Sequence, residues 1–258
     1  MQRIDERWNE STQARAIPLS EARGEALPVS NPVLRNTYVL LALTLAFSAL
    51  TAGVSMALGL PHPGLIITLV GYFGLLFLVH KLANRASGIL AVFALTGFMG
   101  YTLGPILSAY LALPNGSAIV MQAFGGTAAI FLGLSAYATI SKRDFSFMGG
   151  FLFVGVLVAF LAGLAAIFFQ MPGLSLAVSA MFVLLMSGLI LYETSQIVRG
   201  GETNYILATV SLYVMIFNLF TSLLSAWGVQ RRRLSRTRFF AGQEGARQAP
   251  FPFFGPGW

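Results

Sequence analysis

The stretch LILYETSQIVRGGETNY, residues 189–205, places one carboxylate, that of Glu193, near the end of a long apolar run. The runs on either side, 174–198 and 205–228, each reach the roughly 20 residues that a helix needs to cross a bilayer. The loop between the two runs begins at Arg199. The stretch therefore predicts a transmembrane hairpin with an acidic residue inside its first arm.

The composition extends this prediction to most of the chain. Of the 258 residues, 56% are hydrophobic and 10% are charged, and the mean hydropathy is +0.76. Soluble domains carry about 25% charged residues, because a surface in water needs them. Apolar runs of spanning length lie at 37–60, 64–80, 88–111, 118–140, 147–170, 174–198 and 205–228. We therefore expect an all-α polytopic membrane protein, with seven transmembrane helices in one membrane domain over 35–229.

The basic residues predict the orientation. The turns near residues 62, 114 and 172 contain no Lys or Arg, whereas the alternate loops hold Lys81 and Arg85, Lys142 and Arg143, and Arg199. The positive-inside rule then places the N-terminus and these three loops in the cytoplasm. Five Arg residues between 231 and 238 conflict with this rule, because seven spans put the C-terminus outside. The alternative is a re-entrant sixth or seventh segment that returns the C-terminus to the cytoplasm.

The two ends of the chain are polar and basic. Eleven of the 16 Lys and Arg residues lie within 1–35 and 231–247, a placement that fits a membrane surface rather than nucleic acid. Residues 1–34 are expected to form a disordered cytoplasmic tail. Residues 230–258 form a basic and aromatic tail, which we expect to be disordered on lipid headgroups. A dedicated partner-binding peptide is the alternative for this second tail.

Glu193 is the one acidic residue within the predicted spans, and it lies about 9 Å of helix before Arg199. An ionised carboxylate at depth costs roughly 2.5–3.5 kcal/mol on insertion scales, so it must face water, pair, or be protonated. Acids inside membranes are by default functional, and we interpret Glu193 as a gate or cavity residue. The alternative is that it snorkels or bonds locally to a neighbouring helix.

The seventh run carries a polar stripe. Ser211, Asn218 and Ser225 are spaced by seven, and Ser222 follows Asn218 by four, so all four fall on one helical face. A polar stripe must be buried against protein or water inside a membrane. We therefore expect the seventh helix to be central, whether the stripe lines a cavity or makes ordinary interhelical hydrogen bonds.

Small residues predict close helix packing in the third and fourth runs. Gly100 and Gly104 form a small-xxx-small pair, and Pro105 after them predicts a kink. We interpret Gly125, Gly126 and Gly133 in the same way, as structural residues.

The chain resembles the Bax inhibitor family of membrane proteins, in particular its bacterial YccA branch. The resemblance covers about 33–228 and is carried by VLRNTYVLLALTLAFSALTA (33–52), GFMGYTLGPIL (97–107), YATISKRDFSFMGG (137–150) and LYETSQIVRGGETNYILATVSLYVMIFNLFTSLL (191–224). It implies six helices around a central seventh and a bacterial inner (plasma) membrane location. For the YccA branch it implies binding and restraint of the membrane AAA protease FtsH and its membrane complex. For other branches it implies a pH-sensitive calcium leak closed by a pair of acidic residues.

One departure from the family pattern bears on the leak. Glu193 matches the first acid of the pair, but Met215 stands where leak members carry an aspartate three residues before the Asn that matches Asn218. A single carboxylate supplies fewer of the six to eight oxygens that Ca²⁺ takes. In channel-type relatives a basic residue latches the acidic pair, and Lys81 is the matching candidate. We therefore expect protease modulation, with a leak of Ca²⁺ or protons as the alternative.

Sequence patterns of enzymes and metal proteins are missing. The chain has no phosphate-binding glycine loop, no metalloprotease helix motif and no Ser-His-Asp arrangement. It has no Cys, and His62 and His80 are too far apart to suggest a metal site. We expect no catalytic residue, no cofactor and no metal.

Overall fold

The structure, a computed structural model, describes residues 32–247, and the predictions for 1–31 and 248–258 lie outside the described residues. Within 32–247 the chain forms helices and no strand. The helices are α2 (Pro32–Ala57), α3 (Leu65–Leu82), α4 (Ser87–Leu111), α5 (Gly116–Ser141), a short 3-10 turn η1 (Ser146–Met148), α6 (Gly149–Phe168), α7 (Pro172–Arg199) and α8 (Tyr205–Arg247). Seven of them are long and apolar enough to cross a membrane. The all-α prediction with seven transmembrane helices is confirmed.

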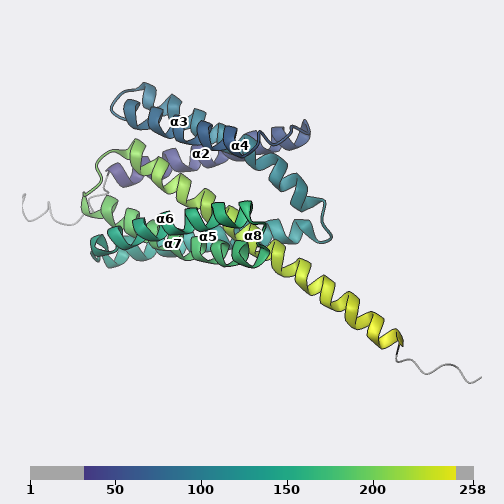
Figure 1. The fold of residues 1–258 in the computed structure, drawn as a ribbon. Helices are drawn as coiled ribbons and strands as arrows, with labels where there is room; N and C mark the ends of the chain where they lie inside the picture. The colour runs from purple at the N-terminus through teal and green to yellow at the C-terminus, as the bar shows by residue number, and fades with distance from the viewer. Residues whose placement is uncertain (1–31, 248–258) are drawn as a thin grey trace, which may run out of the picture. The chain divides into compact units, whose positions relative to one another are not determined.

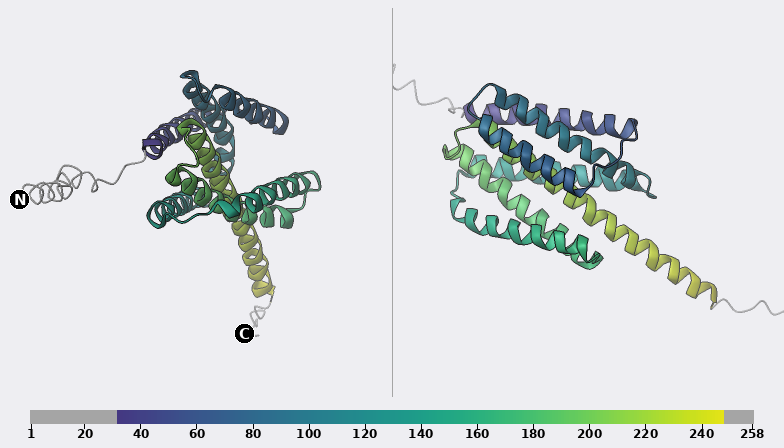
Figure 2. Two further views of the ribbon diagram at one scale, coloured as in Figure 1. Left: turned by 90° about the vertical axis from the view of Figure 1, so that its left-hand side faces the viewer. Right: turned by 45° about the horizontal axis from the view of Figure 1, so that its top comes forward.

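Helix α8 occupies the centre of the bundle, as predicted. It runs between a group formed by α2, α3 and α4 and a group formed by α5, α6 and α7 (Figures 1 and 2). In an 18-residue window of its spanning part 56% of the residues are buried, against 44% in α4 and 6% in α3. Helices α7 and α5 pack along α8, whereas α3 packs on α4 and α6 packs on α7. The shell around α8 is therefore uneven, with α3 and α6 in the outer positions.

Polar contacts join α8 to the first group of helices. The hydroxyls of Ser48 on α2 and Tyr213 on α8 share a hydrogen bond of 2.7 Å, and the Tyr213 hydroxyl also donates to the Thr96 carbonyl of α4 at 3.3 Å. Thr209 donates to the Thr37 carbonyl at 3.3 Å. Tyr213 is 1% exposed, and a buried phenol in a membrane needs such partners.

Glycines bring α2 and α4 together. A Cβ at Gly100 would collide with Ser48 and Thr51, and one at Gly104 would lie 2.6 Å from Ser55. The predicted close packing of this pair is confirmed, and α4 continues through Pro105 as one helix.

The same prediction for the fourth run was largely wrong. A Cβ at Gly126 would reach Leu223 at 3.4 Å, but one at Gly125 or Gly133 would have no atom within 4 Å. These two glycines lie on an exposed face of α5, where no neighbouring helix of this chain approaches them.

Helix α8 is longer than the predicted seventh span. The apolar part is Tyr205–Gly228, and the backbone stays helical to Arg247. The disordered tail expected from residue 230 is therefore wrong for 230–247, where the helix projects beyond the rest of the bundle (Figures 1 and 2). At about 1.5 Å per residue, this 43-residue helix is roughly 64 Å long and exceeds the bilayer thickness. An unbroken α8 favours seven full spans over a re-entrant seventh segment.

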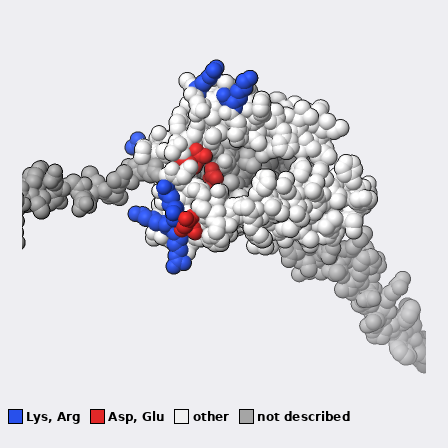
Figure 3. Space-filling model, turned by 60° about the vertical axis from the view of Figure 1, so that its left-hand side comes forward, with Lys and Arg blue, Asp and Glu red and all other residues white. Residues whose placement is uncertain are grey.

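Basic side chains gather at one end of the bundle. The end that holds the start of α2 and the loops α3–α4, α5–α6 and α7–α8 carries Arg35, Lys81, Arg85, Lys142, Arg143 and Arg199. Figure 3 shows the Lys and Arg side chains collected at this end, beside the acidic groups. We call it the charged end, and by the positive-inside rule it remains our prediction for the cytoplasmic side.

Thiol labelling tests this orientation. The chain has no Cys of its own, so a single introduced Cys reports one position. An impermeant reagent added to cells stripped of their outer membrane is expected to label Ser117→Cys and Gly173→Cys, and to leave Ala86→Cys unlabelled until the cells are opened. Cys at Gly255 is expected to label from outside, and its protection in intact cells would favour the re-entrant alternative.

Candidate functional site at the charged end

Glu193 lies on the last turns of α7, against α8. Its side chain is half-buried, and the Ser211 hydroxyl of α8 lies beside its carboxyl group. Glu202, in the loop that follows α7, is near enough to act on it electrostatically. The next residue, Thr194, is fully buried, and its hydroxyl lies 3.4 Å from that of Ser135 on α5. Glu193 thus stands where α7, α8 and α5 meet.

The residues of the predicted polar stripe of α8 lie in different environments. Ser211 meets Glu193, whereas the Asn218 amide donates to the Val214 carbonyl of its own helix at 2.8 Å. Ser222 is 9% exposed. Met215, one turn beyond Ser211, is also 9% exposed and packs in the hydrophobic core. An apolar side chain therefore fills the position of the second acid, and the gate roles of these residues remain predictions.

The turn after Glu193 is fixed by backbone chemistry. Gly200 has φ 78°, and the Gly201 N–H donates to the Gln196 carbonyl at 2.8 Å, the six-to-one bond of a Schellman motif. Gly200 thus ends α7. The chain then begins α8 within five residues.

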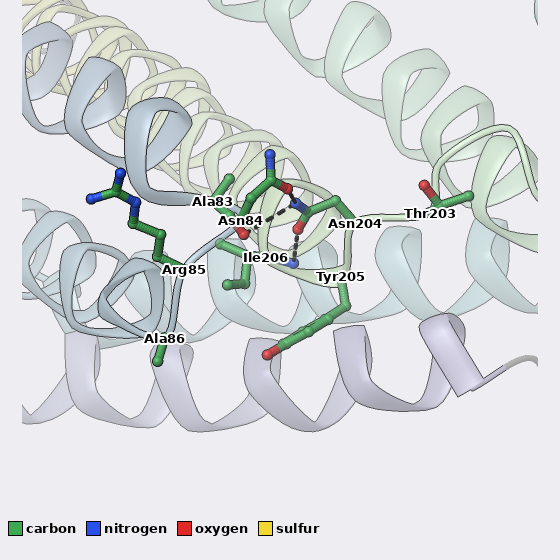
Figure 4. Close-up of a pocket in the computed structure, with 8 residues that line it drawn as sticks. All are labelled: Ala83, Asn84, Arg85, Ala86, Thr203, Asn204, Tyr205 and Ile206. Atoms are coloured by element: carbon green, nitrogen blue, oxygen red, sulfur yellow. Dashed lines mark hydrogen bonds between the residues drawn. The ribbon is translucent and has the colours of Figure 1, made fainter.

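Asn204 connects this turn to the loop between α3 and α4. Its Oδ1 accepts hydrogen bonds from the backbone N–H of Ile206 at 2.9 Å and of Leu207 at 3.3 Å, which caps α8. Its Nδ2 donates to the Ala83 carbonyl at 3.1 Å and to Oδ1 of Asn84 at 3.0 Å. These contacts cross a pocket of about 380 Å³ that also borders Arg85 (Figure 4). Asn204 was not among the predicted site residues, although an Asn directly before a helix signals a cap.

The loop between α5 and α6 is tied to the end of α7. The Ser195 hydroxyl donates to the Arg143 carbonyl at 2.8 Å, and the Gln196 amide donates to Ser146 at 3.0 Å. Arg199 and Asp144 form a half-exposed ion pair of 3.0 Å. Hydrogen bonds from Ser146, with Arg199 as a lesser cause, hold the pKa of the Asp144 carboxyl below its usual range. The residues around Glu193 therefore anchor loops as well as helices.

Lys81 stands in the last turn of α3 with an exposed side chain. The ion pair found among the described side chains joins Arg199 to Asp144, and it does not include Lys81 or Glu193. The latch role of Lys81 stays a prediction. Searched over the described residues, no group of His, Asp and Glu is placed to hold a metal ion.

Removing Asn204 is expected to weaken the charged end. Asn204→Ala loses the cap of α8 and both bridging bonds, and we expect the free energy of unfolding in mild detergent to fall by about 1–2 kcal/mol. Asn204→Asp keeps the capping oxygens and loses the two donors, so it is expected to lose less. Thermal unfolding followed by circular dichroism compares them, and equal stability of Asn204→Ala and the unmodified protein would contradict the role of this bridge.

Known proteins are similar to this chain in sequence. The family model described as "Inhibitor of apoptosis-promoting Bax1" matches residues 30–232. The chain belongs to this family, the Bax inhibitor family. It is 56% identical over 203 residues to "Modulator of FtsH protease YccA" of Escherichia coli, which covers 79% of this chain and 92% of that relative.

Three further relatives support the assignment. An uncharacterized protein of Pseudomonas aeruginosa is 54% identical over 217 residues, 84% of this chain and 97% of the relative. An uncharacterized membrane protein of Vibrio cholerae is 49% identical over 201 residues, 78% and 90% of the two chains. Another Escherichia coli relative, also 56% identical, is named "Inner membrane protein YccA". With its seven spanning helices, this member of the Bax inhibitor family is a multi-pass inner-membrane protein.

Proposed function

We propose that the protein modulates a membrane AAA protease of the FtsH type, as a protein that the protease engages but extracts poorly. The observation that carries this proposal is the 56% identity, over 92% of its length, to a relative named as a modulator of FtsH protease. The relatives are named as modulators or membrane proteins and not as enzymes, which is consistent with a regulatory rather than a catalytic role.

The fold suits a protein that resists extraction. Pulling on the N-terminus loads α2 first, and α2 is joined to α8 through Ser48–Tyr213 and Thr37–Thr209. It also interlocks with α4 at Gly100 and Gly104. Because α8 lies at the centre, removal of α2 must open the core before any other helix is released. The polar residues 1–34 are the proposed handle for the protease.

A calcium leak gated at Glu193 is the second candidate function. It is favoured by the position of Glu193, a half-buried carboxylate that meets a hydroxyl of the central helix. It is opposed by Met215, because a buried thioether offers no carboxylate oxygen to Ca²⁺. The protease role is therefore our first choice.

Co-purification tests the proposed function. The tagged protein, expressed at its native level and isolated in mild detergent, is expected to carry the membrane protease, identified by mass spectrometry. A tagged, unrelated seven-helix protein prepared in parallel gives the background. Recovery of the protease at that background level would contradict the proposal.

A further inference from the structure

An apolar groove of about 590 Å³ lies between α2, α4, α5 and α8, in the half of the bundle away from the charged end. At its inner wall the hydroxyls of Ser48 and Tyr213 bond to each other. Its rim is exposed, with Ala46, Ala49 and Gly53 on α2 facing Phe124 and others on α5. The groove therefore opens sideways, toward the hydrocarbon of the bilayer.

Several glycines in this bundle mark the close approach of another segment, whereas others, such as Gly125, face open space. A Cβ at Gly100 or Gly104 would run into α2, and one at Gly155 would lie 2.6 Å from Leu185 of α7. Gly53, on the groove rim, has no atom within 4 Å of the place a Cβ would take. Gly53 would let another backbone come close, but no segment in the described part of the chain does so.

We propose that this groove receives a transmembrane helix of the membrane protease named under the proposed function, on which the inference rests. A chain can cross a bilayer only as helices or as a closed barrel, because other backbone leaves its N–H and C=O groups without hydrogen bonds in lipid. We take the membrane protease to cross with helices. Transmembrane helices associate through small residues that let their backbones approach. Ala46, Ala49 and Gly53 supply such a rim on α2.

The connection of α2 to the N-terminal residues selects the protease over other occupants. Residues 1–31 lead directly into α2, so a protease that holds them is tethered to the helix that forms the rim. A lipid acyl chain and a second copy of this chain have no such tether. A helix seated in the groove would brace α2 against α5, so the partner that pulls on α2 would also secure it.

Photo-crosslinking from within the membrane tests the docking site. A benzophenone side chain at Ala49 is expected to capture the protease in the full-length protein, and the same probe at Leu161, on the exposed face of α6, is not. Capture of lipid only, or of a second copy only, from Ala49 would overturn the inference, as would equal capture of the protease from Leu161. If the protease co-purifies in that case, the docking site fails while the proposed function stands. If it does not co-purify at all, the proposed function fails first.

A matched pair of substitutions gives a second measurement. Gly53 and Gly74 both lie on exposed helix faces with no atom within 4 Å of a Cβ, so a side chain at either position begins in open space. Gly53→Leu blocks the groove rim, and we expect it to reduce the recovered protease about tenfold. Gly74→Leu on α3 is expected to change recovery little. Equal recovery with the two variants would overturn the proposed site.

Discussion

Met215→Asp is expected to give proteoliposomes an acid-sensitive calcium leak, at least about tenfold above that of the unmodified protein, a difference worth about 1.4 kcal/mol. Residue 215 is one turn from Ser211, which meets Glu193. An aspartate there would place a second carboxylate beside the first, with more oxygens for Ca²⁺. Two adjacent carboxylates also titrate as a coupled pair. Flux is measured with an entrapped calcium dye between about pH 6 and 8.

The controls separate charge from packing. Met215→Asn has the shape of aspartate without its charge and is expected to leave the flux at the unmodified level. Adding Glu193→Gln to Met215→Asp is expected to abolish the acid sensitivity. A robust leak from the unmodified protein that Glu193→Gln does not alter would show that the conducting chemistry lies elsewhere.

Deletion of residues 2–31 is expected to lengthen the half-life of the protein several-fold in cells that contain the membrane protease. The deletion ends before Pro32 and therefore keeps α2 whole. It removes the proposed handle, so the bundle remains folded but presents less chain to grip. Pulse-chase measurement in cells with and without the protease gives the half-lives, and thermal unfolding in detergent checks the fold.

Truncation at the other end provides the control for this deletion. Removing residues 248–258 is expected to leave the half-life unchanged, because the unbroken α8 begins at the charged end and reaches Arg247 on the opposite side. Equal turnover of the full chain and the 2–31 deletion by the same protease would show that the N-terminal residues are not the handle.

The sequence predicted the spans well because hydropathy and length alone decide which segments cross a bilayer. Each apolar run became a helix with ends within a few residues of the predicted ones, except that α8 continues to Arg247. The central place of α8 followed from its polar residues, which lipid excludes. The match to the Bax inhibitor family added the expected partner without specifying a contact surface.

Contacts between distant segments could not be predicted. Gly100 and Gly125 look alike in sequence, yet α2 approaches the first and no helix of this chain approaches the second. Asn204 bonds across about 120 residues to Asn84, and Tyr213 bonds to Ser48 across 165. Such pairs depend on how helices are placed around α8, which no local pattern records. The continuation of α8 to Arg247 was missed because its charged residues resemble a surface tail.

The central claim, that the protein restrains a membrane AAA protease, is tested most directly by reconstitution. Purified protease is placed in proteoliposomes with an unrelated membrane substrate and ATP, with or without this protein at increasing ratios. We expect degradation of the substrate to slow several-fold as the unmodified protein is added. When the Gly53→Leu variant is added in its place, we expect the degradation rate to return toward its original value. An unchanged rate of degradation at saturating amounts of the folded protein would contradict the claim.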